Sequence, residues 1–323
     1  MNTKDYLPLI ESTLVSIFEG KEPYNLYEPI RYVLSIGGKR LRPTFALMAC
    51  DLFGGKVNDA VYPACALEVY HNFTLLHDDI MDNADMRRGK PTVHNVWNEN
   101  TAILSGDAML ILAYRLMADC DKEKLADVLH TFTETTMEIC EGQQWDMEFE
   151  TRMDVKVEEY IEMIRLKTSV LLAAALKIGA CLAGAPAEDA QKLYDFGVKV
   201  GLAFQLQDDW LDVYGDPKVF GKNIGGDILC NKKTYMLITA LEQADARQRE
   251  ELEKWLAAKH YEPAEKIAAV TALYDEIGVG KMCQAKAEAL HAEGFAVLDS
   301  IALPEERKQV LREYACSMLN RNV

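Results

Sequence analysis

Apolar side chains recur at three- and four-residue spacing along nearly the whole chain, which is the pattern of α-helices that bury at least one face. Alternation of apolar and polar positions, the pattern of strands, is nearly absent. The helical runs cover about residues 4–18, 25–36, 43–53, 58–84, 101–119, 122–149, 154–183, 187–214, 231–257, 262–275, 277–298 and 304–320. The pattern predicts an all-α fold, a single large bundle of about ten to twelve helices around a central cavity.

Glycine and proline mark the ends of these runs, as at residues 54–55, 184–186 and 215–217. No serine- and glycine-rich linker and no low-complexity segment divides the chain, so residues 1–323 are predicted to form one domain. The stretch 173–184 is rich in alanine and glycine, and such small side chains allow helices to pack closely. We therefore expect this helix to lie in the middle of the bundle.

The amino-acid composition excludes several classes of protein. Hydrophobic residues at 49% are sufficient for a core, and the formal net charge of −16 excludes a nucleic-acid partner, because phosphate backbones bind basic surfaces. The eight cysteines contain no Cys-x-x-Cys motif and are expected to be buried free thiols of a reducing, cytoplasmic compartment. The first residues lack a secretory signal pattern. The most apolar stretch, 169–187, contains Lys177, so no stable membrane insertion is expected.

Two acidic motifs of the form Asp-Asp-x-x-Asp interrupt apolar helical runs, one at residues 78–82 and one at residues 208–212. Residues four apart on a helix share a face, so the first and last aspartates of each motif project together. Unpaired buried carboxylates are costly, so a cation is expected among them, and Mg²⁺ is the hard divalent ion that prefers oxygen ligands. Both motifs lie near the C-terminal ends of their runs. They are predicted to meet at the mouth of one cavity, where Mg²⁺ would hold a diphosphate.

Basic side chains accompany both motifs. Arg87 and Arg88 follow the first motif, and guanidinium groups donate bidentate hydrogen bonds to phosphate oxygens. The turn 37–43, Gly-Gly-Lys-Arg-Leu-Arg-Pro, leads into a helix and is a candidate site for a second anion. Further lysines that stand in apolar contexts and can serve as phosphate charges are Lys167, Lys222 and Lys232. Together with the long apolar interior, these residues indicate a substrate that joins a diphosphate to a hydrophobic tail.

The motifs resemble those of the trans-isoprenyl diphosphate synthases. Residues 71–94 are similar to the first aspartate-rich motif of that family, and residues 201–212, followed by Gly221-Lys222 and Gly226-Asp227, are similar to the second. Residues 37–43, 142–146 and 167–168 match further family motifs in the family's order, so the resemblance spans about residues 25–235. It implies the isoprenoid synthase type I fold and a homodimer.

The reaction implied by this resemblance is Mg²⁺-dependent head-to-tail prenyl transfer. Isopentenyl diphosphate condenses with an allylic diphosphate (dimethylallyl, geranyl or farnesyl), and diphosphate is released. The family resemblance further implies about three Mg²⁺ ions in each active site, for which Mn²⁺ can substitute. Ionisation of the allylic C–O bond is promoted by the positive charges around the departing diphosphate.

The resemblance also implies roles for individual residues. The Mg²⁺ ligands would be Asp78, Asp82 and Asp208, with Asp79 and Asp212 supporting them. The allylic diphosphate would be bound by Arg87, Lys167, Thr168, Gln205, Lys222 and Lys232. Isopentenyl diphosphate would be bound by Gly38, Lys39, Arg42, His71 and Arg88. The catalytic residues would be Asp78, Asp82, Asp208, Lys167 and Arg87, and Arg321 resembles the basic tail of some members.

Product length is predicted from the side chains that precede Asp78. Phe73 lies five residues before it and Thr74 lies four before it, and an aromatic residue followed by a small one resembles archaeal-type geranylgeranyl diphosphate synthases. Tyr70, one turn deeper, would add to the floor of the cavity in which the product grows. These residues predict a short all-trans product, with geranylgeranyl diphosphate (twenty carbons) ahead of farnesyl diphosphate (fifteen carbons).

Three other functions stay open on the sequence alone: a longer-chain polyprenyl diphosphate synthase, a class I terpene cyclase and a non-catalytic partner subunit. A cyclase would carry an Asn/Asp-x-x-Ser/Thr-x-x-x-Glu motif in place of residues 208–212 and would have no use for Lys39 and Arg42. A non-catalytic subunit is expected to lack some of the aspartates, yet both motifs are complete. Residues for which a purely structural role is also considered are His71, His77, His94, Gln143 and Asp146.

Overall fold

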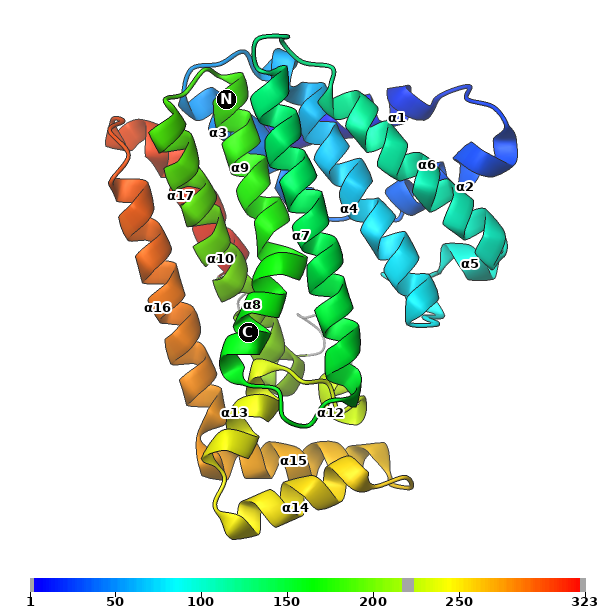
Figure 1. Ribbon diagram of the computed structural model, residues 1–323, viewed down its shortest axis with the longest axis vertical. Coiled ribbons are helices and arrows are strands. Elements are labelled where there is room, and N and C mark those ends of the chain that lie inside the picture. Colours follow the sequence, from blue (N-terminus) through cyan, green and yellow to red (C-terminus); the bar gives the residue numbers. More distant parts are fainter. Residues whose placement is uncertain (1–2, 217–223, 320–323) are drawn as a thin grey trace. The chain divides into compact units, whose positions relative to one another are not determined.

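The computed structural model describes residues 3–216 and 224–319, and it confirms the all-α prediction (Figure 1). The helices are α1 (Thr3–Phe18), α2 (Tyr24–Ser35), α3 (Leu41–Leu52), α4 (Val61–Met81), α5 (Val93–Val96), α6 (Glu99–Met117), α7 (Leu125–Thr151), α8 (Val157–Ile164), α9 (Val170–Leu182), α10 (Ala187–Tyr214), α12 (Gly226–Leu229), α13 (Tyr235–Gln243), α14 (Ala246–Ala257), α15 (Pro263–Ile277), α16 (Val279–Asp299) and α17 (Glu305–Leu319), with a 3-10 helix at Val57–Ala60. Among the described residues, no helix combines the length and the apolar character that crossing a membrane requires. The predicted site residue Lys222 and the tail residue Arg321 lie outside the described residues.

The chain divides into two compact units, each of which holds one of the acidic motifs. The first unit comprises Met1–Glu134, Ala174–Tyr194 and Ala302–Leu311. The second unit comprises Thr135–Ala173, Asp195–Ile301 and Arg312–Val323. The helices α7, α9, α10 and α17 contribute residues to both units. The expectation of one domain over the whole chain stays a prediction.

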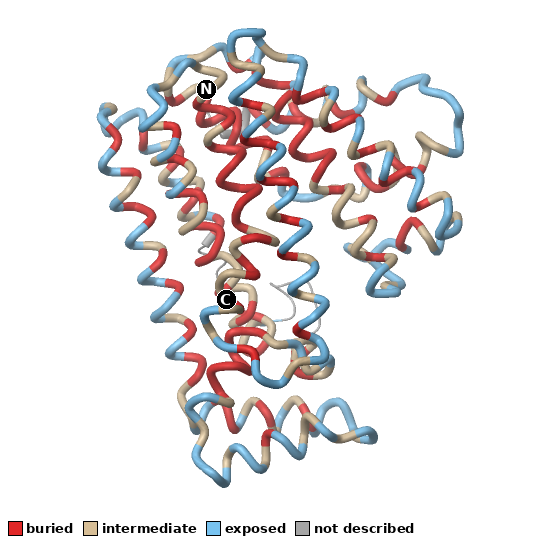
Figure 2. Tube along the Cα trace, in the orientation of Figure 1, coloured by how far each residue is buried: buried red, intermediate tan, exposed pale blue. Residues whose placement is uncertain are grey.

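The alanine-rich helix α9 is buried over most of its length, as the sequence predicts (Figure 2). Within the first unit it lies directly against α3: a Cβ added at Gly179 would stand 2.0 Å from the carbonyl oxygen of Ala46. Only glycine permits so close an approach of two backbones. The helix α4 packs against both α3 and α6 in the same unit. The first acidic motif is thus the end of a helix that is fixed on two sides.

The core of the second unit is formed by apolar residues of α8, α10, α13, α15 and α16. Leu206 of α10 and Cys283 of α16 are fully buried in this core, and the Cys283 thiol donates a hydrogen bond of 3.3 Å to the carbonyl oxygen of Leu206. Leu206 lies two residues before Asp208. The packing of α10 against α16 therefore fixes the helix just before the second acidic motif.

All eight cysteines are free thiols, but the expectation that they are buried is only partly right. Cys50, Cys65 and Cys283 are buried, whereas Cys140 on α7 and Cys230 after α12 are exposed. The sequence could not separate these classes, because apolar neighbours in the chain do not reveal which face of a helix reaches the solvent.

A short hairpin follows α4, at a place where the sequence shows no strand pattern. Its strands β1 (Met86–Arg87) and β2 (Lys90–Pro91) pair in antiparallel register. The turn residues Arg88 and Gly89 have φ angles of 50° and 74°. Positive φ at both central residues is the requirement of a type I′ turn. Strands of two residues are too short to alternate, so periodicity could not predict them.

A π-helical turn, Arg165–Ser169, interrupts the run that the sequence predicts as one helix and separates α8 from α9. The helix α7 contacts this turn closely, because a Cβ at Gly142 would stand 2.5 Å from the backbone nitrogen of Lys167. Lys167 and Thr168 both lie on the turn. Single π turns inside α-helices are frequent at functional sites.

Candidate active site

The first acidic motif forms the C-terminal turn of α4. Asp79 is buried, and Arg87 of the hairpin holds both of its oxygens: the Arg87 Nε lies 2.8 and 2.9 Å from them, and Nη2 lies 2.7 Å from Oδ1. Asp78 is partly exposed, and Asp82, the residue that caps the helix, is exposed. Arg87 therefore neutralises the central carboxylate, while the two outer carboxylates lie at the accessible end of the helix.

The second acidic motif lies near the C-terminal end of α10, and its central aspartate is again the buried one. Asp209 accepts hydrogen bonds from the Tyr160 hydroxyl (2.5 Å), the Gln205 side chain (3.3 Å) and the Tyr235 backbone nitrogen (3.4 Å). Burial raises the pKa of Asp209 to about 7, against the opposing effect of the hydrogen bond from Tyr160. Asp208 is partly exposed.

The two motifs share one arrangement, in which a buried central aspartate anchors the turn and the outer aspartates are more accessible. The sequence assigned support roles to Asp79 and Asp212 and gave none to Asp209. Asp212 is partly exposed, and its Oδ2 accepts a hydrogen bond of 3.0 Å from the backbone nitrogen of Asp227. The role of Asp209 could have been found from its equivalence to Asp79 within the repeated motif. Metal ligation and the meeting of the motifs at one cavity stay predictions.

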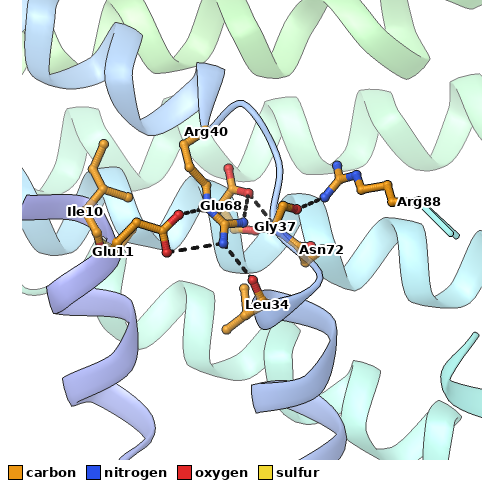
Figure 3. Close-up of polar contacts among 9 residues, drawn as sticks. Ile10, Glu11, Leu34, Gly37, Arg40, Glu68, Asn72 and Arg88 are labelled. Atoms are coloured by element: carbon orange, nitrogen blue, oxygen red, sulfur yellow. Dashed lines mark hydrogen bonds and ion pairs between the residues drawn. The ribbon is translucent and has the colours of Figure 1, made fainter. Parts of the chain in front are cut away.

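Arg40, in the basic turn between α2 and α3, points into the protein and is only 2% exposed. Its φ of 48° is left-handed, and its guanidinium contacts Glu11 (2.8 Å), Glu68 (2.8 Å) and the carbonyl oxygen of Leu34 (2.6 Å), as Figure 3 shows. The Asn72 side chain donates a further hydrogen bond of 3.0 Å to Glu68. Arg40 therefore fixes the turn to α1, α2 and α4.

Three other cationic side chains of the first unit gather around His71. The Nε of Arg42 is buried and has no hydrogen-bond partner among the described residues. Burial lowers the pKa of Arg42 to about 10. The negative charge of Glu68 acts in the opposite direction but does not offset the effect of burial. Burial and the nearby charges of Arg42, Arg88 and Arg87 hold the pKa of His71 well below its usual range.

His71 therefore lies among arginine side chains, and only some of these arginines form ion pairs with carboxylates among the described residues. Arg88 donates a hydrogen bond to the carbonyl oxygen of Gly37 (Figure 3), and a Cβ at Gly38 would stand 2.8 Å from the Arg88 Nη1. Lys39 is exposed in the same turn. The structure thus brings Gly38, Arg42, His71 and Arg88 together within one unit, and the partly buried guanidinium groups of such a cluster can be stabilised by an anion.

The cations of the second unit are placed around the second motif and the π turn. Lys167 forms an ion pair of 2.6 Å with Asp146. Thr168 follows it and is partly exposed. Lys232 is exposed, and its charge lowers the pKa of Asp209. Gln205 donates to the same aspartate. The pairing of Lys167 gives Asp146 a structural contact, one of the two roles considered for it on the sequence.

Aromatic rings line α4 before the first motif. Tyr70 is buried between Phe73 and Phe132, with ring centroids 5.4 Å from each. Phe73 is partly exposed and lies 4.8 Å from the His77 ring. The His77 ring also packs against α6, where a Cβ at Gly106 would stand 2.2 Å from Nε2. This packing agrees with the structural interpretation of His77. Thr74 donates a hydrogen bond of 2.8 Å to the carbonyl oxygen of His71.

Comparison with known proteins points to one family. The sequence profile of the family described as polyprenyl synthetase matches residues 23–274. The short chain isoprenyl diphosphate synthase of Methanothermobacter thermautotrophicus is 38% identical over 292 residues, which are 90% of this chain and 86% of that protein. The geranylgeranyl diphosphate synthase of Methanosarcina mazei is 42% identical over 236 residues, which are 72% of this chain and 73% of that protein. A crystal structure of a geranylgeranyl pyrophosphate synthase has a TM-score of 0.95 at 43% identity and covers 100% of both chains.

We predict that Glu68→Gln destabilises the protein, because it removes the buried carboxylate that faces Arg40. Breaking a buried ion pair costs about 3–5 kcal/mol, and the loss should fall at the lower end because Glu11 still contacts Arg40. The free energy of unfolding in urea measures it. Glu28→Gln is the matched control, since its partly exposed pair with Arg31 contributes about 0.5 kcal/mol or less. Equal losses in the two variants would contradict the assignment.

We also predict that the wild type loses stability relative to His71→Gln as the pH falls from about 7.5 to about 5. The folded pKa of His71 lies well below its value of about 6.5 in the unfolded chain, so acid protonates the unfolded state first. The contribution is complete above that value and is lost at up to about 1.4 kcal/mol per pH unit below it. Urea unfolding across this pH range measures it, with His130→Gln on the exposed face of α7 as control. A difference between wild type and His71→Gln that does not change with pH contradicts the prediction.

Proposed function

The chain belongs to the polyprenyl synthetase family and is a prenyltransferase, and we propose that it makes a short all-trans prenyl diphosphate. It would condense isopentenyl diphosphate head-to-tail with dimethylallyl, geranyl and farnesyl diphosphates and release diphosphate. Geranylgeranyl diphosphate is the proposed main product, ahead of farnesyl diphosphate. The high similarity to a solved geranylgeranyl pyrophosphate synthase supports this choice.

The observation that carries the proposal is the shared arrangement of the two acidic motifs. In each one the central carboxylate is buried and bonded within its own unit, by Arg87 at Asp79 and by Tyr160 at Asp209. The outer carboxylates are more exposed and stand at a helix end. Accessible carboxylates near one another at a helix end are the kind of ligand that Mg²⁺ prefers.

The donor set fits Mg²⁺ that is shared with a substrate. Among the described residues, no three histidine, cysteine or acidic side chains lie close enough to enclose a metal without other ligands. Mg²⁺ is commonly held by one or two carboxylates together with substrate phosphates and waters, which suits a motif that offers an outer pair. We assign Asp78, Asp82 and Asp208 as ligands, Asp79 and Asp212 as their supports, and about three Mg²⁺ ions, for which Mn²⁺ can substitute. When bound, these ions neutralise charge on the diphosphate.

The two substrates would occupy different sets of cations. Arg42, His71 and Arg88, with Lys39 and the backbone at Gly38, would bind isopentenyl diphosphate, because the guanidinium groups of Arg42 and Arg88 form no ion pair among the described residues and the Nε of Arg42 is buried without a hydrogen-bond partner there. The allylic diphosphate would be bound by Arg87, Lys167, Thr168, Gln205, Lys222 and Lys232. Arg87 and Lys167 hold carboxylates in this structure, so substrate binding would require each to extend its contacts to phosphate oxygens.

Catalysis in this arrangement needs no protein nucleophile. Positive side chains stabilise the departing diphosphate, so the allylic C–O bond breaks and leaves a carbocation. The double bond of isopentenyl diphosphate, held in place by its own diphosphate, attacks that cation. Loss of a proton restores an alkene, and the released diphosphate is the proposed acceptor.

We further propose a homodimer that works in the cytoplasm. The helix α6 exposes the large apolar residues Ile103, Leu104 and Ile111, which a second copy could cover. Eight free thiols are typical of a reducing compartment. Sedimentation equilibrium of the purified chain tests the assembly, and a monomer at micromolar concentration would refute it.

The decisive experiment incubates the purified chain with labelled isopentenyl diphosphate, Mg²⁺ and allylic primers of five, ten or fifteen carbons. We predict that Asp78→Ala and Asp208→Ala each lower kcat/KM at least about 100-fold, the effect of removing a principal electrostatic contact. The folds should persist, because like charges that repel without metal contribute little to stability. Asp195→Ala, on the exposed face of α10, is the control. Near-normal turnover in either motif variant would refute the assignment, and a wild type that makes cyclic or no products would refute the proposed function.

Product length is predicted to depend on Phe73. It lies about 7.5 Å before Asp78 along the helix axis, so Phe73→Ala should open space at the end of the growing chain and release longer products. Its loss of stability should stay below the roughly 3–5 kcal/mol of a packed phenylalanine, because Phe73 is partly exposed. Phe295→Ala, which removes a ring packed on Phe196 in the other unit, should leave the product unchanged. Chromatography of the dephosphorylated products decides, and an unchanged distribution in Phe73→Ala would transfer the limit to Tyr70.

A further inference from the structure

Lys266, on α15, is a fully buried lysine that forms no ion pair with any described residue. It is 0% exposed, and its ammonium lies 2.6 Å from Asn231 Oδ1, 3.4 Å from the carbonyl oxygen of Leu229 and 4.4 Å from the centre of the Tyr261 ring. The Tyr261 hydroxyl donates to the same Leu229 oxygen at 3.2 Å. All of these partners are uncharged, so the positive charge of Lys266 is held but not neutralised by them.

Stability alone gives no reason for a charge at this position. Taking an ammonium out of water costs several kcal/mol, and an apolar side chain of similar volume often gives equal or greater stability. Methionine would fill the same space next to the surrounding apolar residues. The contacts of Lys266 instead fix a segment of the chain, residues 225–232.

Lys266 holds one end of the segment 225–232, and the second acidic motif holds the other end. The backbone nitrogens of Gly225 and Asp227 donate to the carbonyl and carboxylate oxygens of Asp212, at 2.6 and 3.0 Å. The segment then forms the four-residue helix α12, which ends at Leu229, and Lys266 contacts the carbonyl oxygen of Leu229. Figure 1 shows α12 beside α15, and the two helices are in contact.

Asn231 is the second contact of Lys266 and the point at which the chain turns towards Lys232. Its φ of 54° is left-handed, a conformation that asparagine tolerates better than most residues. Its side chain accepts from Lys266 and donates to the carbonyl oxygen of Leu256 at 3.1 Å, so it ties the turn to α15 and to α14. The backbone nitrogen of Lys232 donates back to Asp227 at 2.9 Å.

Lys266 also lines a small cavity in the second unit. Asp209, Asp227, Lys232 and Lys266 all line it, and its apolar lining includes Leu252 and Tyr274. The buried aspartate of the second motif and the lysine proposed for the allylic diphosphate thus lie on the same cavity as Lys266. A shift of Lys266 would reach Lys232 through Asn231, the residue that precedes it in the chain.

We infer that Lys266 is a positioning residue, which fixes the segment 225–232 between Asp212 and Lys232 so that Lys232 is presented to the allylic diphosphate. This inference rests on the proposed function for the substrate, but the contacts themselves do not. Lys266 itself is not proposed to touch substrate or metal. It acts through Asn231 and Leu229.

The first test measures amide hydrogen exchange of the full chain without substrate or metal, so it does not depend on activity. Lys266→Met should speed exchange at residues 225–232 at least about tenfold, because α12 loses a charge-assisted contact, while α9 exchanges as in wild type. Lys308→Met is the matched control: Lys308 is 5% exposed but lies in the other unit and pairs with Glu305. Unchanged exchange at 225–232 in Lys266→Met overturns the inference.

The second test separates positioning from a general loss of stability. Lys266→Met should raise KM for the allylic primer about tenfold, the equivalent of one charge-assisted contact, and leave KM for isopentenyl diphosphate within about twofold. Lys266→Arg, which keeps the charge, should recover part of the loss. Equal rises in both KM values, or no recovery with arginine, overturn the inference.

A third variant covers the case in which Lys266→Met does not fold. Asn231→Gly keeps the left-handed backbone and removes the oxygen that Lys266 contacts, so it should give the same local exchange and the same change in KM. Wild-type exchange in Asn231→Gly overturns the inference. If the wild type itself makes no prenyl diphosphate, the proposed function fails, and the exchange of 225–232 still decides whether Lys266 positions this segment.

Discussion

The crowding of like charges at a helix end is the constraint on which the candidate site depends. Three carboxylates on little more than one turn repel one another, and the repulsion is strongest where water is excluded. The protein meets this constraint in the same way in both units. It buries the middle carboxylate against hydrogen-bond donors of its own unit, Arg87 for Asp79 and Tyr160 for Asp209, and leaves the outer two nearer to solvent. The buried member anchors the turn, and the outer members lie where cations can reach them.

A comparable division exists among the arginines of the first unit. Arg40 forms an ion pair with the buried Glu68, and Arg87 forms one with the buried Asp79, so both arginines have structural contacts. Arg42 and Arg88 form no such pair among the described residues, although both lie near Glu68. Residues of the same type, a few positions apart, thus have opposite tasks. The paired arginines fix the backbone, and the remaining ones keep positive charge in a place that suits an anion.

The sequence predicted the helices well because each helix buries an apolar face, and such a face appears in the sequence as apolar residues three and four positions apart. It also located both motifs at helix ends, which the structure confirms for α4 and α10. It missed the hairpin at residues 86–91 and the π turn at Lys167, since both are too short to have a period and depend on contacts such as that of Gly142. It gave no role to Asp209 or Lys266, because their importance lies in burial and in partners distant along the chain. Which arginine is paired and which is not is likewise a tertiary property.

The contact between Gly106 and His77 has a consequence for how the protein can change. His77 stands between Phe73, the proposed limit on product length, and Asp78, and its ring occupies the space that any side chain at position 106 would need. The same helix, α6, carries the exposed residues Ile103, Leu104 and Ile111 on which a second copy is proposed to pack. A sliding of α6 by a fraction of a turn, caused from its outer face, would press on His77 from the inner one. We therefore expect substitutions on α6 that alter assembly to change product size as well, so that the two properties would evolve together.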